Sequence, residues 1–437
     1  MKLIVLGKFV IADPRTVLGD AGVVMGDDTI TAVGPNARLL ADYRGYEVLD
    51  RRDCIIAPGF INSHMHSYGI LSHGITPPVE IEDFEAFLEK FWWPLVENRL
   101  DAPMIAAAGR ASAVELLESG VTAFCDILEA PNAIPGGLEA FAGAIDDLGM
   151  RAVLSFEASE RVSPENGQAG LIENRDFTLA YAGHPRISGK MCIHTTFTCP
   201  RPFIRKAAEM ARSTGSGIQM HLSESRYEPE WCMRHYGKLP VEVYEELGFL
   251  DEQVLASQGV KLSDYEIDIL AARGVKLAHV PLSNCEVGGG FSPVPDLLAR
   301  GITVGLGTDG YINNFFEVMR GAFLLHKAHR EDPEAMPAAD VYAMATEHGA
   351  DALGVPGGKL EAGGAADIIT IQANFPTPVT PANLLGQLIL YRNPSDVLEV
   401  WVGGRKLKEN GQLINVDRDK IRAAACREAG RLWDFSS

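Results

Sequence analysis

Histidine and acidic residues follow several apolar, β-branched stretches of this chain, at spacings that suit a metal ion. His64 and His66 end IIAPGFINSHMH, His221 and Glu224 lie in GIQMHLSES, and Asp309 ends ITVGLGTDG. In an extended strand, side chains two positions apart point to the same face, so His64 and His66 converge. Three imidazoles and a carboxylate form a ligand set for a divalent metal. With one position left for water, this set is typical of a catalytic site.

The composition narrows the class of protein. The 437 residues include 46% hydrophobic and 22% charged residues, which is typical of a globular protein with a large core. A net charge of −19 disfavours partners such as nucleic acid or an anionic membrane surface and fits an enzyme for a neutral or cationic small molecule. Seven cysteines without CxxC pairs indicate free thiols in a reducing cytoplasm. The sequence predicts neither a signal peptide nor a membrane span.

Strand and helix patterns alternate from about Ala102 to Glu331, after a first strand before them. Eight strand candidates, each followed by a helix, predict a parallel sheet closed into a (β/α)8 TIM barrel. The active site of such a barrel lies at the carboxyl ends of its strands. Polar residues mark these predicted ends: His64, His66, Asp126, Glu157, His194, His221, Gln258, His279 and Asp309.

The two ends of the chain have a different pattern, with short strands and turns. We expect residues 1–56 and 360–415 to form one composite β-sandwich domain. Residues 57–359 would then form the metal-dependent barrel, and residues 416–437 a C-terminal helix. The fold class predicted is therefore α/β, with a TIM barrel and a small β-sandwich built from both chain ends.

These motifs together resemble the amidohydrolase superfamily, in its branch of aminohydrolases and chlorohydrolases. The likeness is to S-adenosylhomocysteine/methylthioadenosine deaminases and triazine hydrolases, and it covers nearly the whole chain. Each motif is weak alone, but HxH after an apolar strand, followed in order by HxxE and TDG, is specific. The segments that carry the likeness are PGFINSHMH, IHTTFTCP, MHLSES, LAHVPLSN, GLGTDG and GKLEAGGAADIITI.

The resemblance implies a role for each matching residue. One divalent ion, usually zinc and sometimes iron, would be bound by His64, His66, His221 and Asp309. Glu224 would be the proton shuttle. The remaining two matches, His194 and His279, would contact the substrate. Dimers or tetramers are common among proteins that this chain resembles, so we expect a homo-oligomer.

Gln258 departs from the family pattern. The stretch SQGVKL stands where the family usually has a histidine, which orients the attacking hydroxide. Glutamine can donate a hydrogen bond from its amide, but it cannot carry a positive charge. Losing one charged donor to the transition state typically costs about 10²–10³ in rate. Gln258 therefore indicates either impaired catalysis or adaptation to a special substrate.

The function predicted is a metal-dependent hydrolase that deaminates an amino-substituted heteroaromatic ring of the purine, pterin, pyrimidine or triazine type. A metal-bound hydroxide would attack the ring carbon, with Asp309 as base and Glu224 as proton donor to the ring nitrogen and the leaving ammonia. Glu224 favours an amine as leaving group, because chloride leaves without a proton. Two alternatives stay open: another leaving group (chloride, alkylamine or amide), and a metal-binding protein with impaired catalysis.

Several of these motifs and residues also permit other interpretations. Gly305, Gly307 and Gly310 spell a GxGxxG dinucleotide motif, but Asp309 within it would repel a pyrophosphate. His194 and His279 could be hydrogen-bonded core histidines. Asp126 and Glu157 fit a polar layer inside the barrel, and the Trp92–Trp93 pair fits helix packing better than a pocket wall.

Overall fold

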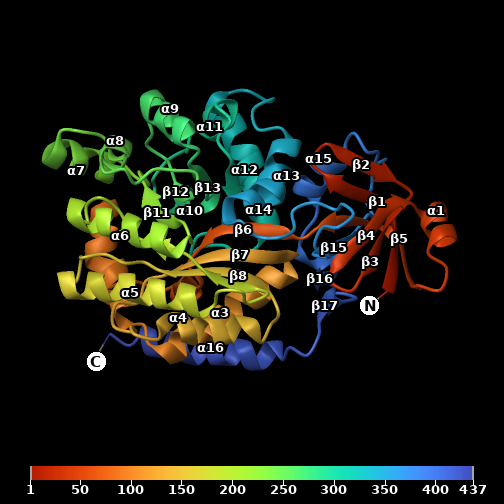
Figure 1. Cartoon of the computed structure of the whole chain (residues 1–437), viewed down its shortest axis with the longest axis horizontal. Coiled ribbons are helices and arrows are strands. Elements are labelled where there is room, and N and C mark those ends of the chain that lie inside the picture. Colours follow the sequence, from red (N-terminus) through yellow and green to blue (C-terminus); the bar gives the residue numbers. More distant parts are fainter. Residues whose placement is uncertain (1, 436–437) are drawn as a thin grey trace.

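A computed structural model gives the structure of the chain and describes residues 2–435. Within these residues, the strands form two nine-stranded sheets. One sheet is parallel and covered by helices, and the other is built from both ends of the chain (Figure 1). The mixed α/β class predicted from the alternating patterns is confirmed.

The parallel sheet contains every strand that the apolar, β-branched stretches predict. Its order is β10-β11-β12-β13-β14-β6-β7-β8-β9. All eight residues of β7 are buried, as expected for a strand covered on both faces. The bounds are β6 (Phe60–Met65), β7 (Val121–Leu128), β8 (Arg151–Phe156), β9 (Ile187–Gly189), β10 (Met191–Cys192), β11 (Ile218–Leu222), β12 (Val254–Gln258), β13 (Lys276–His279) and β14 (Val304–Leu306).

The two ends of this strand order are formed by neighbouring pieces of the chain. β9 and β10 stand at opposite ends of the order, yet only Lys190 separates them in the sequence. A parallel bridge joins Ala158, just after β8, to Ile193, just after β10. The amide of Lys190 also donates to the carbonyl of Leu154, with 3.1 Å between nitrogen and oxygen. Backbone pairing therefore brings the two ends together.

Helices connect the parallel strands, and local sequence sets their limits. The helix α9 begins after Ser263, which forms a capping box with Glu266, and ends at Gly274 with φ +70°, as such caps favour. The helices are α3 (Ala102–Glu118), α4 (Gly137–Asp146), α5 (Pro164–Ala180), α6 (Arg201–Thr214), α7 (Tyr227–Tyr236), α8 (Pro240–Glu246), α9 (Asp264–Arg273), α10 (Pro281–Glu286), α11 (Val294–Ala299), α12 (Phe315–Arg330), α13 (Ala338–Ala345) and α14 (Glu347–Leu353).

The second sheet contains strands from both ends of the chain. Its order is β18-β17-β16-β15-β5-β1-β3-β4, with β2 paired to β1, and the antiparallel β5–β15 pair links the two ends. Trp401 is fully buried in its core. The strands are β1 (Lys2–Asp13), β2 (Thr16–Gly19), β3 (Ala21–Gly26), β4 (Thr29–Pro35), β5 (Glu47–Pro58), β15 (Ile368–Gln372), β16 (Val397–Val402), β17 (Arg405–Glu409) and β18 (Gln412–Leu413).

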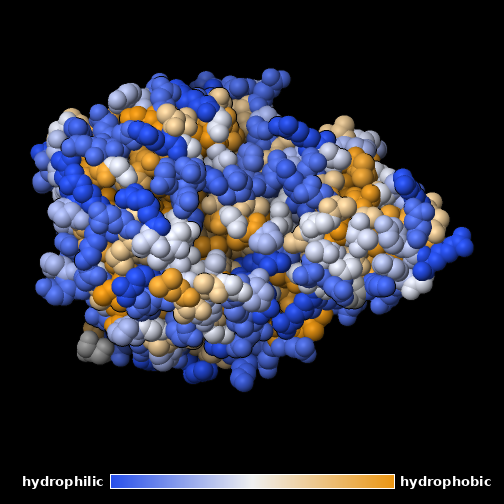
Figure 2. Space-filling model, viewed as in Figure 1, coloured by the Kyte–Doolittle hydropathy of each residue, from blue (hydrophilic) through white to orange (hydrophobic). Residues whose placement is uncertain are grey.

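Three further helices belong to the chain ends: α1 (Asn36–Asp42), α15 (Leu384–Tyr391) and α16 (Arg418–Leu432). The last one corresponds to the predicted C-terminal helix, of which residues 436–437 lie outside the described part. It runs along α3, beneath the parallel sheet (Figure 1). No helix within residues 2–435 is long and apolar enough to cross a membrane. The face in Figure 2 is mostly hydrophilic, with scattered hydrophobic side chains.

A segment that the sequence patterns do not predict follows β6. It consists of the 3-10 turn η1 (Ser67–Ser72), the short helix α2 (Phe84–Ala86), the π-helix η2 (Phe87–Val96) and the 3-10 turn η3 (Glu97–Arg99). π-Helical turns are rare and are frequent at functional sites. Side chains of this segment line a cavity of about 840 Å³.

Candidate metal centre and active site

Three buried histidines gather at the carboxyl ends of two strands. His64 lies on β6 and His66 just after it, while His221 lies on β11. One ring nitrogen of each lies within 4.8 Å of the others. The Nε2 atoms of His66 and His221 are 3.1 Å apart. Two such nitrogens facing each other need a shared proton or a cation between them, so this arrangement fits a metal ion.

The surroundings of these rings favour the neutral form that binds metals. His66 Nδ1 lies 2.8 Å from the carbonyl oxygen of Ile127, so Nδ1–H donates there and Nε2 keeps its lone pair. His64 Nε2 is buried and has no hydrogen-bond partner among the described residues. Burial lowers the pKa of both His64 and His66, which keeps the rings uncharged.

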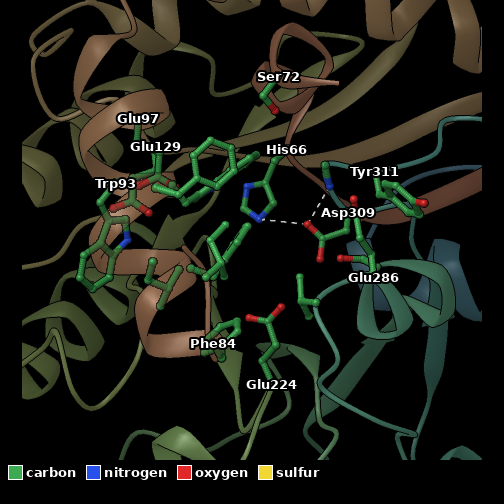
Figure 3. A pocket seen from close by; sticks show the side chains of 18 of the residues that line it. His66, Ser72, Phe84, Trp93, Glu97, Glu129, Glu224, Glu286, Asp309 and Tyr311 are labelled. Carbon is green, nitrogen blue, oxygen red and sulfur yellow. Dashed lines mark hydrogen bonds and ion pairs between the residues drawn. The ribbon is translucent and has the colours of Figure 1, made fainter. Parts of the chain in front are cut away.

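Asp309, the fourth predicted ligand, lies beside these three rings. It follows β14 in a left-handed conformation, φ +58°. Its Oδ1 lies 3.6 Å from His66 Nε2 (Figure 3), and its Oδ2 lies 4.0 Å from His64 Nε2. Burial opposes ionisation of Asp309, but hydrogen bonds from the backbone N–H of Gly310 and from the amide of Gln258, both 2.7 Å long, stabilise the ionised carboxylate. Asp309 is therefore an ionised carboxylate beside the three rings.

Gln258 contacts the predicted base directly. It ends β12 with a left-handed backbone, φ +71°, a conformation that costs free energy in any residue but glycine. Its Nε2 donates to Asp309 Oδ2 at 2.7 Å. Its Oε1 is buried without a hydrogen-bond partner within residues 2–435. The side chain that replaces the family histidine thus holds the carboxylate of Asp309.

Glu224 faces the same cavity from the end of β11. Figure 3 shows Glu224 and Asp309 both directed into it. Burial and the negative charge of Asp309 raise the pKa of Glu224 to about 8, whereas a hydrogen bond from Gln258 acts in the opposite direction. The carboxyl group of Glu224 is therefore protonated at neutral pH and can give a proton to a ligand.

The cavity beside these residues has a volume of about 840 Å³, which suits a ligand of drug or nucleoside size. His194, on the strand end after β10, lines it. The Nδ1 of His194 lies 2.8 Å from Thr198 Oγ1, and its Nε2 lies 3.3 Å from Glu157 Oε1. His194 is thus placed where a substrate contact is predicted.

His279 lies apart from this cavity. Its Nε2 is 3.1 Å from His326 Nε2 on α12. Among the described residues, those that line the cavity do not include His279. A direct substrate contact of His279 stays a prediction, and its observed partner is another buried histidine.

The sequence did not single out several residues that line or support the cavity. Trp93, which we had assigned to helix packing, lines it. Glu97 and Glu129 line it too, and both accept hydrogen bonds from Arg161. A signal existed for Glu129, because it directly follows β7, just as Glu157 directly follows β8. Arg161 and Glu97 stand in irregular segments, where no periodic pattern marks them.

Comparison with known proteins identifies the family. Residues 55–407 match the model of the Amidohydrolase family. The chain belongs to the amidohydrolase family. A 5'-deoxyadenosine deaminase of Methanosarcina acetivorans is 33% identical over 410 residues, covering 92% of this chain and 91% of that protein. A 5-methylthioadenosine/S-adenosylhomocysteine deaminase of Thermococcus sibiricus is 32% identical, covering 93% of each.

Solved structures show the same fold as this amidohydrolase. An adenosine deaminase from Xanthomonas campestris with bound zinc superposes with a TM-score of 0.89 at 24% identity, covering 98% of both chains. The atrazine chlorohydrolase of Arthrobacter aurescens TC1, complexed with zinc, gives a TM-score of 0.83 at 24% identity, covering 98% of this chain and 100% of that one. The predicted resemblance is confirmed, and with it a metal-dependent hydrolase of C–N bonds of the deaminase type.

Proposed function

We propose that this amidohydrolase removes the exocyclic amino group from the adenine ring of a small nucleoside. The observation that carries the proposal is the placement of ionised Asp309 and protonated Glu224 on one cavity, beside three converging histidines. The cavity of about 840 Å³ has room for a nucleoside. Relatives over 30% identical are named for deaminating adenosine derivatives, which favours adenine over a pterin, pyrimidine or triazine.

The metal in this proposal is one divalent ion, held by the Nε2 atoms of His66 and His221, by His64, and by Asp309. When bound, such an ion supplies Lewis-acid activation of water, whose pKa falls to about 7. Nitrogen and oxygen ligands suit both zinc and iron. The zinc in similar structures supports zinc here.

The chain's own residues then move the protons. Asp309, held by the amide of Gln258, takes the proton of the attacking water. Glu224 gives its proton to the ring nitrogen beside the carbon that loses the amino group, and later helps ammonia leave. Because the amide of Gln258 hydrogen-bonds Asp309, it fixes the position of the base in the cavity that Glu224 also lines.

Finer features of the molecule belong to the same proposal. We infer that the parallel sheet closes into the (β/α)8 barrel over residues 57–359, which the bridge between Ala158 and Ile193 supports. Residues 1–56 and 360–415 would form the sandwich domain. A cytoplasmic location and a dimer or tetramer stay predictions. A chloride leaving group is the weaker alternative, because it would leave the protonated Glu224 without a task.

The test is ammonia release from adenosine, 5'-deoxyadenosine and methylthioadenosine by metal-replete protein. We expect turnover of at least one, with the ultraviolet shift from adenine to hypoxanthine. The variant Glu224→Gln keeps the shape of the side chain but cannot exchange a proton, so kcat should fall by about 10²–10⁴ while metal content stays unchanged. Absence of ammonia from all three nucleosides would refute adenine deamination.

A further inference from the structure

The wall of the active-site cavity is acidic. Eight acidic side chains line it, of which Glu224 is protonated at neutral pH, whereas its lining within residues 2–435 contains neither lysine nor arginine. One divalent ion would offset only part of this charge. Such a surface attracts cations and repels anions, and the attraction is strong in a partly enclosed site.

Three of these acidic side chains are deeply buried. Glu97, Glu129 and Glu157 are 2%, 3% and 2% exposed, and we call them the acidic wall. The one guanidinium that pairs with the wall is Arg161: its Nη2 donates to Glu97 Oε2 at 2.9 Å, and its Nε donates to Glu129. Three carboxyl groups thus share one positive charge. Burial and their mutual repulsion raise the pKa of Glu97 and Glu157, so a further cation at the wall would favour their ionised forms.

One oxygen of the wall still lacks a partner. Glu157 Oε1 is buried and accepts no hydrogen bond from residues 2–435. The ring nitrogens of His194 and His221 lie 3.3 Å and 3.5 Å away, outside hydrogen-bond geometry. Because Glu157 lines the cavity, a donor from a ligand could reach this oxygen.

An aromatic surface adjoins the acidic wall. Trp93 lines the cavity next to Glu97 and Glu129 in Figure 3. The guanidinium carbon of Arg161 lies 5.1 Å from the centroid of the Trp93 ring. Trp92 and Phe87 line the cavity as well. The faces of such rings stabilise ammonium groups, so the chemistry of this surface agrees with that of the wall.

We propose that the substrate carries an alkylammonium group on the substituent of its heteroaromatic ring, and that the acidic wall binds this group. The inference rests on the proposed deamination and names the substrate class for it. Figure 3 shows Glu97 and Glu129 on one side of the cavity and Asp309 and Glu286 on the other, so a ligand can present its ring to Glu224 and its cation to the wall. A substituent with a carboxylate would meet no basic partner there.

The experiment compares three adenine nucleosides of similar size that differ in charge at the 5' position. They are 5'-amino-5'-deoxyadenosine, 5'-deoxyadenosine, and adenosine with a 5'-carboxylate, each measured at neutral pH. We expect kcat/KM to be at least about 10-fold higher for the ammonium than for the neutral compound, and lowest for the carboxylate. Equal values, or a preference for the neutral compound, would overturn the inference.

A variant that removes one acidic group tests whether the acidic wall causes the preference for the ammonium compound. In the wild type, the hydroxyl of Tyr68 donates to Glu97 at 2.9 Å. In Glu97→Gln, the amide oxygen can still accept from Arg161, and the amide nitrogen can donate to the hydroxyl of Tyr68. We expect the ammonium preference to fall by about 10-fold. Glu160→Gln, one residue from Arg161 and outside the cavity lining, makes the same change in net charge and should keep the preference.

Binding separates this inference from the proposed function. Dissociation constants for the three nucleosides, followed by the fluorescence of Trp92 and Trp93, do not require turnover. Ammonium binding at least about 10-fold tighter than the neutral compound, without ammonia release, would refute deamination of adenine but retain the cation site. Turnover of the nucleosides in which neither kcat/KM nor binding depends on their charge would retain the deamination and refute the cation site. Absence of binding by all three nucleosides would overturn both.

Discussion

At the residue scale, the question is how the site works with glutamine where the family usually has histidine. Gln258 Nε2 donates to Asp309 Oδ2 at 2.7 Å, and Gln258 and Glu224 line the same cavity. Its left-handed backbone, φ +71°, is the kind of strain that functional sites retain. We conclude that the amide holds the base in place, so its task here is positioning rather than charge.

Two substitutions test this account of Gln258. Gln258→Leu removes the hydrogen bond to Asp309 at similar volume, and we expect kcat to fall by about 10–100-fold with one metal ion still bound. Gln258→His should give no gain, because the amide already performs the positioning. The measurements are steady-state kinetics and metal content of each variant. An increase in kcat of about 10-fold in Gln258→His would show that glutamine impairs the wild-type enzyme.

The site residues that could be predicted from the sequence are those that lie at strand ends. His64, His66 and His221 could be predicted because strand periodicity and strand ends mark them. Glu97 and Arg161 could not, because they approach the cavity from irregular segments and meet only through the tertiary fold. His279 shows the limit of the pattern: it marks a strand end, yet its Nε2 faces His326.

At the scale of elements, close contact between β14 and β6 positions the metal ligands. A Cβ on Gly307 would lie 2.7 Å from the carbonyl oxygen of His64 and 3.1 Å from its Cβ. Such distances to backbone cannot be relieved by turning a side chain. The glycine at this position therefore lets His64 and Asp309, on neighbouring strands, approach each other.

The corresponding prediction concerns Gly307→Ala. The added methyl group should push β14 away from His64, lower the free energy of unfolding by about 1–3 kcal/mol and weaken zinc binding. Denaturant unfolding and a zinc titration measure the two effects. Gly143→Ala in α4, where an added Cβ meets nothing within 4 Å, is the control and should leave zinc binding intact. Unchanged zinc affinity in Gly307→Ala would refute this role of the contact.

The sequence predicted all strands of the parallel sheet but not the segment between Ser67 and Arg99. The strands are continuous apolar, β-branched runs that a local pattern reveals. The segment contains a π-helix, Phe87–Val96, whose period matches neither the helix nor the strand template. Its position over the cavity arises from tertiary packing, which local patterns do not encode.

At the scale of the whole molecule, an ion pair joins the two sheets. Arg151 begins β8, and Asp367 directly precedes β15. The guanidinium donates to both carboxylate oxygens of Asp367, at 2.6 Å and 3.1 Å. Asp367 is 1% exposed. The sequence predicted that both chain ends share one β unit, but this contact, 216 residues apart along the chain, could not be foreseen from local patterns.

We expect Arg151→Met to destabilise the protein by about 3–5 kcal/mol, because Asp367 would be left buried without a positive partner. Denaturant unfolding measures this change. Arg38→Met removes an exposed pair with Asp42, whose side chains are 77% and 54% exposed, and should change stability by at most ~0.5 kcal/mol. Equal effects of the two variants would show that the contact between sheets does not stabilise the fold.

The central claim is that His64, His66, His221 and Asp309 hold a single divalent ion that the deamination requires. The most direct measurement is ammonia release by chelator-treated protein during titration with zinc. We predict that the treated protein is inactive and that activity returns linearly, saturating at about one zinc ion per chain. Full activity without metal, or saturation only at a large excess of zinc with none retained, would contradict the account.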